Sequence, residues 1–110
     1  MEPGSPLLTI ERAGGAPNPV VVVHGELDVS TSPMLREELS AVLDEHPDSL
    51  TLDFGDVSFV DSSGLGSLIG ALRRLRETDD GRSLRILHTQ PAVARVFEIT
   101  GLAQVFDLSD

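Results

Sequence analysis

The sequence predicts an α/β fold in which a small mixed β-sheet of four to five strands carries helices mainly on one face. Short segments of strand composition alternate along the chain with longer segments of helical periodicity, which is typical of a layered α/β domain. The 110 residues fit one domain and are too few for two independent cores. We therefore expect a single domain over residues 7–110, preceded by a short flexible tail at 1–6.

Two strands are predicted near the start of the chain. Residues 7–12 have strand composition and are followed by the turn-forming residues 14–19, which indicates an edge strand. Residues 20–24 begin with four consecutive valines, between Pro19 and Gly25. Such a run is typical of a strand buried on both faces, so this segment is predicted to be a central strand.

A first amphipathic helix is predicted to begin near Pro33. The hydroxyl residues of 30–32 are suitable N-caps, and proline is favoured at the first helical position. The apolar residues recur at i, i+4, i+7 and i+8 and should face the core: Leu35, Leu39, Val42 and Leu43. Pro47 ends the helix, and the alternation over 50–54 predicts a third strand.

A second amphipathic helix is predicted from Gly64 to about Thr78. Its apolar residues also follow helical spacing: Leu65, Leu68, Ile69, Leu72 and Leu75. Three arginines gather near its end, at positions 73, 74 and 76. We interpret them as compensation of the helix dipole on a solvated face, in preference to a contact patch.

The last third of the chain predicts one more helix between two short strands. A turn at 79–81 precedes a strand at 84–87, and Pro91 opens a helix that Gly101 ends as a C-cap. The inward residues of this helix should be Val93, Val96 and Phe97. Residues 105–108 are predicted to form a last strand.

Charge and composition exclude several classes of function. The formal net charge of −10, from 18 acidic and 8 basic residues, repels nucleic acid and anionic membrane surfaces, so we expect no direct binding to either. The chain has no cysteine, and His24, His46 and His88 stand singly, so we expect no metal site. Neither a secretory signal nor a membrane-length apolar run is present, which predicts a cytoplasmic protein.

The segment Phe-Val-Asp-Ser-Ser-Gly-Leu-Gly at 59–66 joins a predicted strand to the second helix. It places the hydroxyls of Ser62 and Ser63 at a helix N-terminus, where free N–H groups and the helix dipole stabilise an anion, so a phosphate there should not disrupt the fold. Gly64 and Gly66 leave room for a partner to approach. Asp-Ser-Ser before a helix is also a common N-cap, so the pattern alone leaves the function open.

Three separated blocks resemble the STAS-domain family of bacterial anti-sigma-factor antagonists. They are Gly-Glu-Leu-Asp at 25–28, Val-Asp-Ser-Ser-Gly-Leu-Gly at 60–66 and Phe-Glu-Ile-Thr-Gly-Leu at 97–102, and they agree with the family in order and spacing. The resemblance covers nearly the whole chain and implies a STAS domain that acts as a binding switch and is not an enzyme. The family commonly adds a final helix about where this sequence ends.

In that family, the serine directly after the motif aspartate is phosphorylated by a partner that is both anti-sigma factor and serine kinase. The resemblance implies Ser62 as the acceptor, with Ser63 as the alternate. The unphosphorylated antagonist binds the anti-sigma factor and frees the sigma factor, whereas the phosphorylated form does not bind until a serine phosphatase acts. ATP belongs to the partner, so no cofactor is implied for this chain.

The resemblance also implies a partner-binding surface around Ser62, made of Glu26, Asp28, Asp61, Ser63, Gly64 and Leu65. Asp28 aligns with an acidic loop residue that the family uses there, and a role in capping the turn into the first helix is equally consistent with its position. A phosphate adds about two negative charges beside these carboxylates and repels an acidic or phosphate-bearing partner. We therefore expect binding to be lost without unfolding.

Three other functions compete with this interpretation. A serine hydrolase is disfavoured because the Gly-x-Ser-x-Gly motif is missing and the chain is short for a substrate pocket with triad partners. An acidic carrier protein modified on Ser62 would be a helical bundle, which substantial β-structure would exclude. A STAS module of another system, such as a stress-signalling scaffold or a lipid-transport regulator, has the same fold and is not distinguished by sequence.

Overall fold

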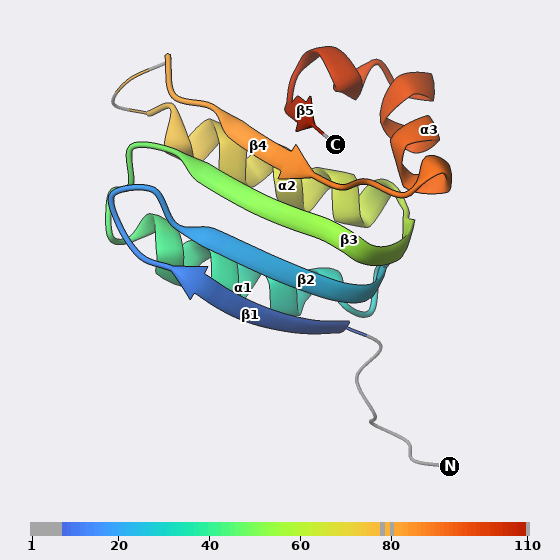
Figure 1. Ribbon diagram of the computed structural model, residues 1–110, viewed down its shortest axis with the longest axis horizontal. Helices are drawn as coiled ribbons and strands as arrows, with labels where there is room; N and C mark the ends of the chain where they lie inside the picture. Colours follow the sequence, from blue (N-terminus) through green and yellow to red (C-terminus); the bar gives the residue numbers. More distant parts are fainter. Residues whose placement is uncertain (1–7, 78, 80, 110) are drawn as a thin grey trace.

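The computed structural model describes residues 8–77, 79 and 81–109. Its elements, in chain order, are β1 (Leu8–Gly14), β2 (Val20–Leu27), α1 (Ser32–Leu43), β3 (Leu50–Val60), α2 (Ser62–Leu75), β4 (Leu84–Leu87), α3 (Pro91–Ile99), the 3₁₀ turn η1 (Leu102–Gln104) and β5 (Asp107–Ser109). The described strands form one five-stranded sheet in the order β1-β2-β3-β4-β5 (Figure 1). The predicted α/β class is confirmed, and the tail predicted at 1–6 lies outside the described residues.

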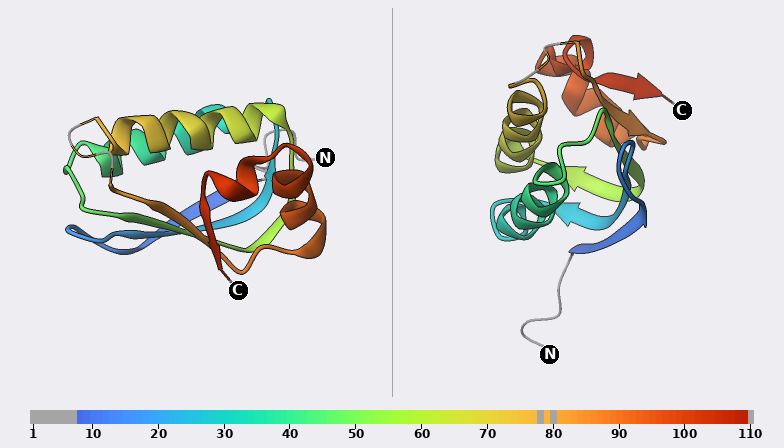
Figure 2. Two further views of the ribbon diagram at one scale, coloured as in Figure 1. Left: turned by 90° about the horizontal axis from the view of Figure 1, so that it is seen from above. Right: turned by 90° about the vertical axis from the view of Figure 1, so that its left-hand side faces the viewer.

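The sheet is mixed, and its topology brings two loops to one edge. β1 pairs antiparallel with β2, while β2, β3, β4 and β5 pair in parallel. Because parallel strands end at the same edge of a sheet, the β2–α1 and β3–α2 loops are neighbours. α1 and α2 lie side by side on one face of the sheet, as predicted (Figure 2).

The core lies between these two helices and the sheet. All four residues predicted to form the inner face of α1 are buried, and so are four of the five predicted for α2, with Ile69 half-buried. Phe97 on α3 packs edge-on against Phe106, with ring centroids 5.8 Å apart, and this contact holds the C-terminal segment to α3. Helical periodicity therefore predicted the core faces of both long helices correctly.

The prediction for β2 was wrong in one respect. Val21, Val23 and Leu27 are buried, but Val20 and Val22 are only half-buried. α1 and α2 cover a single face, so the second face of β2 stays partly open. β2 is an interior strand, paired on both sides, and the middle strand of the five is β3.

Several boundaries differ from the prediction. α2 begins at Ser62, two residues early, and ends at Leu75; Thr78, the predicted end, lies outside the described residues. The cap of α1 is Thr31, but its hydroxyl donates to the Glu26 carbonyl oxygen (2.8 Å) and makes no capping bond to α1. β5 begins two residues later than predicted, because Val105 and Phe106 belong to the turn that follows η1, where both N–H groups donate to the Leu102 carbonyl oxygen.

Two of the three arginines near the end of α2, Arg74 and Arg76, make tertiary contacts that the sequence did not predict. Arg74 donates to the Ser40 hydroxyl (3.0 Å) on α1 and pairs with Asp44. Arg76 Nε donates to the Arg82 carbonyl oxygen (2.7 Å). These contacts tie α2 to neighbouring segments. Within the described ranges, no helix is long and apolar enough to cross a membrane.

Candidate functional site

Ser62 is the first residue of α2, at the edge of the sheet where β3 ends, and it is exposed. Ser63, the next residue, is half-buried, and its carbonyl oxygen accepts a hydrogen bond from the Ser67 hydroxyl (3.2 Å). Of the two motif serines, Ser62 is therefore the more accessible to another protein.

Asp61 caps α2 directly. Its Oδ1 accepts the backbone N–H groups of Ser63 (2.9 Å) and Gly64 (3.1 Å), which are two of the unpaired donors at a helix start. This corrects one expectation, because these donors are not free to stabilise a phosphate on Ser62. A phosphate on Ser62 would therefore share the start of α2 with the Asp61 carboxylate, which already accepts these two donors.

Gly64 and Leu65 pack in the interior of the protein beneath the β3–α2 loop. Both are buried, and a Cβ placed on Gly64 would lie 2.7 Å from Cγ of Leu27 on β2. Only glycine allows α2 to begin this close to β2. Contact of these two residues with a partner stays a prediction, whereas their packing role is visible in the fold.

Asp28 organises the β2–α1 loop. Its Oδ1 accepts hydrogen bonds from the Ser30 hydroxyl (2.7 Å), the Ser30 N–H (2.9 Å) and the Thr31 N–H (3.1 Å). These bonds favour the carboxylate and so hold the pKa of Asp28 below its usual value, and the bond from the Ser30 hydroxyl has the largest effect. The turn-capping role that the sequence allowed for Asp28 is therefore present in the fold.

The two loops form one continuous surface. The Asp61 N–H donates to the carbonyl oxygen of Leu27 (3.1 Å), and Glu26 is the register partner of Phe59 on β3. Glu26 is exposed, like Ser62. The carboxylates of Glu26, Asp28 and Asp61 therefore belong to the same edge as the Ser62 hydroxyl.

The same edge exposes apolar side chains that sequence reasoning missed. Val29 in the β2–α1 loop is 72% exposed, Phe59 is 48% exposed and Met34 in the first turn of α1 is 41% exposed. Val29 could have been found from the sequence as a large apolar residue in a polar loop, whereas the exposure of Met34 and Phe59 depends on the fold. Exposed apolar side chains beside polar groups are typical of protein interaction surfaces.

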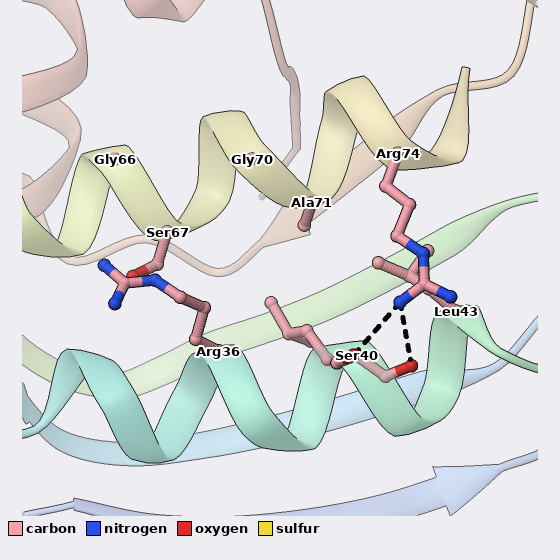
Figure 3. Close-up of a pocket in the computed structure, with 9 residues that line it drawn as sticks. Arg36, Ser40, Leu43, Gly66, Ser67, Gly70, Ala71 and Arg74 are labelled. Atoms are coloured by element: carbon pink, nitrogen blue, oxygen red, sulfur yellow. Dashed lines mark hydrogen bonds between the residues drawn. The ribbon is translucent and has the colours of Figure 1, made fainter. Parts of the chain in front are cut away.

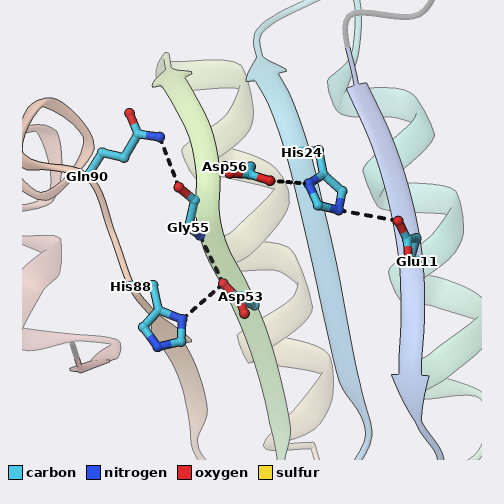
Figure 4. Close-up of polar contacts among 7 residues, drawn as sticks. All are labelled: Glu11, His24, Asp53, Gly55, Asp56, His88 and Gln90. Carbon is cyan, nitrogen blue, oxygen red and sulfur yellow. Dashed lines mark hydrogen bonds and ion pairs between the residues drawn. The ribbon is translucent and has the colours of Figure 1, made fainter.

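The histidines on the open face of the sheet form a separate polar group (Figure 4). His24 Nδ1 lies 2.7 Å from Asp56, its Nε2 lies 3.4 Å from Glu11, and His88 lies 3.2 Å from Asp53. Hydrogen bonds from the Gly55 N–H and then from His88 lower the pKa of Asp53. Across the part of the chain that the structure describes, no group of three or more acidic, histidine or cysteine residues is arranged to hold a metal.

Other proteins share the domain of this chain. The family model for the STAS domain matches residues 8–110. The anti-sigma-B factor antagonist of Bacillus subtilis (strain 168) is 36% identical over 89 residues, which cover 81% of this chain and 79% of that protein.

Solved structures agree with this match. An anti-sigma factor antagonist from Mycobacterium paratuberculosis superposes with a TM-score of 0.79 at 30% identity, covering 93% of this chain and 85% of the other. The antagonist SpoIIAA in its unphosphorylated form gives 0.77 at 26% identity, with 93% and 89% covered. The phosphorylated form of SpoIIAA from Bacillus gives 0.66 at 27% identity, with 94% and 91% covered. The chain therefore belongs to the STAS-domain family, among relatives that are anti-sigma-factor antagonists.

Proposed function

We propose that this protein is an anti-sigma-factor antagonist that binds its anti-sigma factor while Ser62 is unphosphorylated and is released when Ser62 is phosphorylated. The observation that carries the proposal is the exposed Ser62 hydroxyl at an edge that also presents apolar side chains and carboxylates. In this proposal the protein itself is not an enzyme. The partner supplies the serine kinase activity and ATP, and a separate serine phosphatase reverses the modification.

The chemistry of the edge suits a partner surface that is switched by charge. Val29, Met34 and Phe59 supply exposed apolar area in the segments that flank this edge, and Ser62 is exposed at the start of α2. A phosphate brings about −1.5 to −2 charges at neutral pH. Two N–H donors of α2 are already bound to Asp61, so the helix start offers few hydrogen bonds to the phosphate. The phosphate charge is then left to act on the partner.

The relatives support this regulation. SpoIIAA has been solved in an unphosphorylated and a phosphorylated form, and both superpose on this chain. The curated relative carries the name of an anti-sigma factor antagonist, so a STAS module of another system is not favoured. An acidic carrier is excluded as a fold because this chain contains a five-stranded sheet. We place the function in the cytoplasm, where sigma factors and ATP are present.

Substitution of Ser62 tests the proposal. Ser62→Ala should bind an anti-sigma factor from the same organism as tightly as the unmodified protein does, and incubation with that factor and ATP should leave it unlabelled. Ser62→Asp should bind at least tenfold more weakly, because it places a charge at the centre of the surface. Affinity is measured by calorimetry, and the phosphorylated residue is mapped by mass spectrometry.

The matched control is Ala13→Asp, which places the same charge on an exposed residue of β1 at the opposite end of the sheet and should bind as the parent protein does. Ser62→Asp should keep the melting temperature of the parent protein within a few degrees, because the side chain is exposed. Labelling at a residue other than Ser62, or unfolding of Ser62→Asp, would contradict the surface switch.

A further inference from the structure

A groove of about 230 Å³ runs along the surface between α1 and α2 (Figure 3). Its apolar lining includes Leu39 and Leu43 of α1 and Ala71 of α2. On α2 it extends from Gly66 to Arg74, which is about 12 Å along the helix axis. Sites for small molecules typically have volumes of about 300–1,000 Å³, so this groove fits a row of inserted side chains better than a whole ligand.

Two glycines of α2 border the groove without an evident role in the fold. Gly66 and Gly70 are exposed within the helix, and a Cβ placed on either would meet nothing within 4 Å. Glycine inside a helix costs about 1 kcal/mol relative to alanine. Gly64 is explained by its contact with Leu27, but no contact within the fold explains Gly66 or Gly70. The open space above them allows a segment from outside to approach closely.

The two ends of the groove carry arginines in different situations. Arg74 is held across one end by the Ser40 carbonyl oxygen (3.2 Å) and hydroxyl and by Asp44. Arg36 is exposed at the other end and forms no ion pair or side-chain hydrogen bond with any residue that the structure describes. Figure 3 shows its guanidinium extending toward the side where α2 begins. On a chain of net charge −10, Arg36 offers a local site for a carboxylate.

The groove is continuous with the edge that holds Ser62. Ser63 precedes Gly66 and Ser67 by one helical turn and so lies on the same side of α2. The hydrogen bond from the Ser67 hydroxyl to the Ser63 carbonyl oxygen joins Ser67, which lines the groove, to the first turn of α2. A partner that covers Ser62 can therefore continue into the groove.

We propose that the groove receives a helical segment of the anti-sigma partner, with small apolar side chains over Gly66 and Gly70 and a carboxylate directed at Arg36. This inference rests on the proposed function and extends its surface. Helices bind in grooves of this kind through apolar side chains spaced at i and i+4, and the two glycines have the same spacing. The carboxylate complements the charge of Arg36 and fixes the direction of the segment.

Substitutions that fill the groove test the inference. Gly70→Ala should weaken binding of the unphosphorylated protein to the anti-sigma factor by about tenfold, and Gly70→Leu by more, because the added atoms occupy the space of the partner helix. Gly70→Ala should not lower the melting temperature, since alanine favours the helix. Arg36→Gln should weaken binding several-fold and reduce its dependence on salt. The control Arg73→Gln removes the same charge from an exposed residue of α2 outside the groove and should leave binding unchanged.

The outcomes separate the groove from the switch. If Gly70→Leu binds as the parent protein does while Ser62→Asp does not, the groove assignment is overturned and the proposed function stands. If Gly70→Leu fails to bind while Ser62→Asp binds normally, the groove assignment is supported and the role of Ser62 falls. Should Gly70→Leu instead change the sedimentation of the protein on its own, the occupant is a second copy of this chain, and the assignment to the partner is wrong.

Discussion

Replacing Gly64 with alanine tests how closely the two loops of the site are joined. The new Cβ would lie 2.7 Å from Leu27 Cγ and 3.0 Å from both Leu27 Cδ2 and the Leu27 carbonyl oxygen. Leu27 is fully buried, so its side chain has no space to move into. Its carbonyl oxygen also accepts the Asp61 N–H, and a backbone shift would therefore weaken the bond between the loops.

The size of the effect follows from a comparison with Gly66→Ala. Overpacking of a core contact costs about 1–3 kcal/mol. Both substitutions gain the helix propensity of alanine, about 1 kcal/mol, and the Cβ at Gly66 enters open space. The propensity gain largely cancels between the two variants, so Gly64→Ala should be about 1–3 kcal/mol less stable than Gly66→Ala.

Urea unfolding followed by circular dichroism measures this difference directly. We expect Gly66→Ala to be at least as stable as the parent protein and Gly64→Ala to be clearly less stable than Gly66→Ala. If both variants unfold at the same urea concentration with the same slope, the close approach of Gly64 to Leu27 does not hold the loops together, and the reasoning about a rigid edge is refuted.

Two further substitutions test polar contacts. Asp61→Ala removes the acceptor of two N–H groups at the start of α2 and should lower the free energy of unfolding by about 1 kcal/mol. Asp61→Asn keeps an acceptor oxygen and should retain most of the stability of the parent. Equal urea midpoints for Asp61→Ala and the parent would show that this cap contributes nothing. The pKa of Asp53 is lowered in the folded state, so its contribution to stability is present above the unfolded pKa, about 3.9, and is lost as the pH falls through the folded pKa. Asp53→Asn should therefore be less stable than the parent at pH 7. Its free energy of unfolding should also fall less than that of the parent between pH 5 and about pH 2. If the free energy of unfolding falls equally for both proteins over this range, the linkage is refuted.

The parts of the fold that the sequence predicted well are those decided by neighbouring residues. The buried face of α1 follows from the spacing of its leucines, and the start of α3 follows from Pro91. β2 shows what neighbouring residues alone do not predict. A run of four valines indicates a strand, but whether its second face is covered depends on elements far along the chain, and here α1 and α2 cover only one face.

The same distinction applies to the site. The position of Ser62 at a helix start was predictable because the motif contains its own cap residue. The sequence also allowed an N-cap in Asp-Ser-Ser, and the structure confirms Asp61 in that role. That the Asp61 carboxylate accepts both the Ser63 and the Gly64 N–H groups, and so withdraws them from a phosphate, required the structure. Arg74 was interpreted from its place in α2 alone, and its contact with Ser40, 34 residues away in sequence, required the tertiary structure.

A charge switch of the proposed kind depends on a surface that does not rearrange. The β2–α1 loop is held by Asp28, and the β3–α2 loop is held by the Asp61 cap and by Gly64 against the core. A preorganised surface of this kind binds without the cost of ordering its loops, and it also has little freedom to move an added phosphate away from a partner. A hundredfold loss of affinity requires about 2.8 kcal/mol, and like charges brought together at an interface cost several kcal/mol. Under the proposed function, we therefore expect one phosphate on Ser62 to abolish binding while the fold stays as it is.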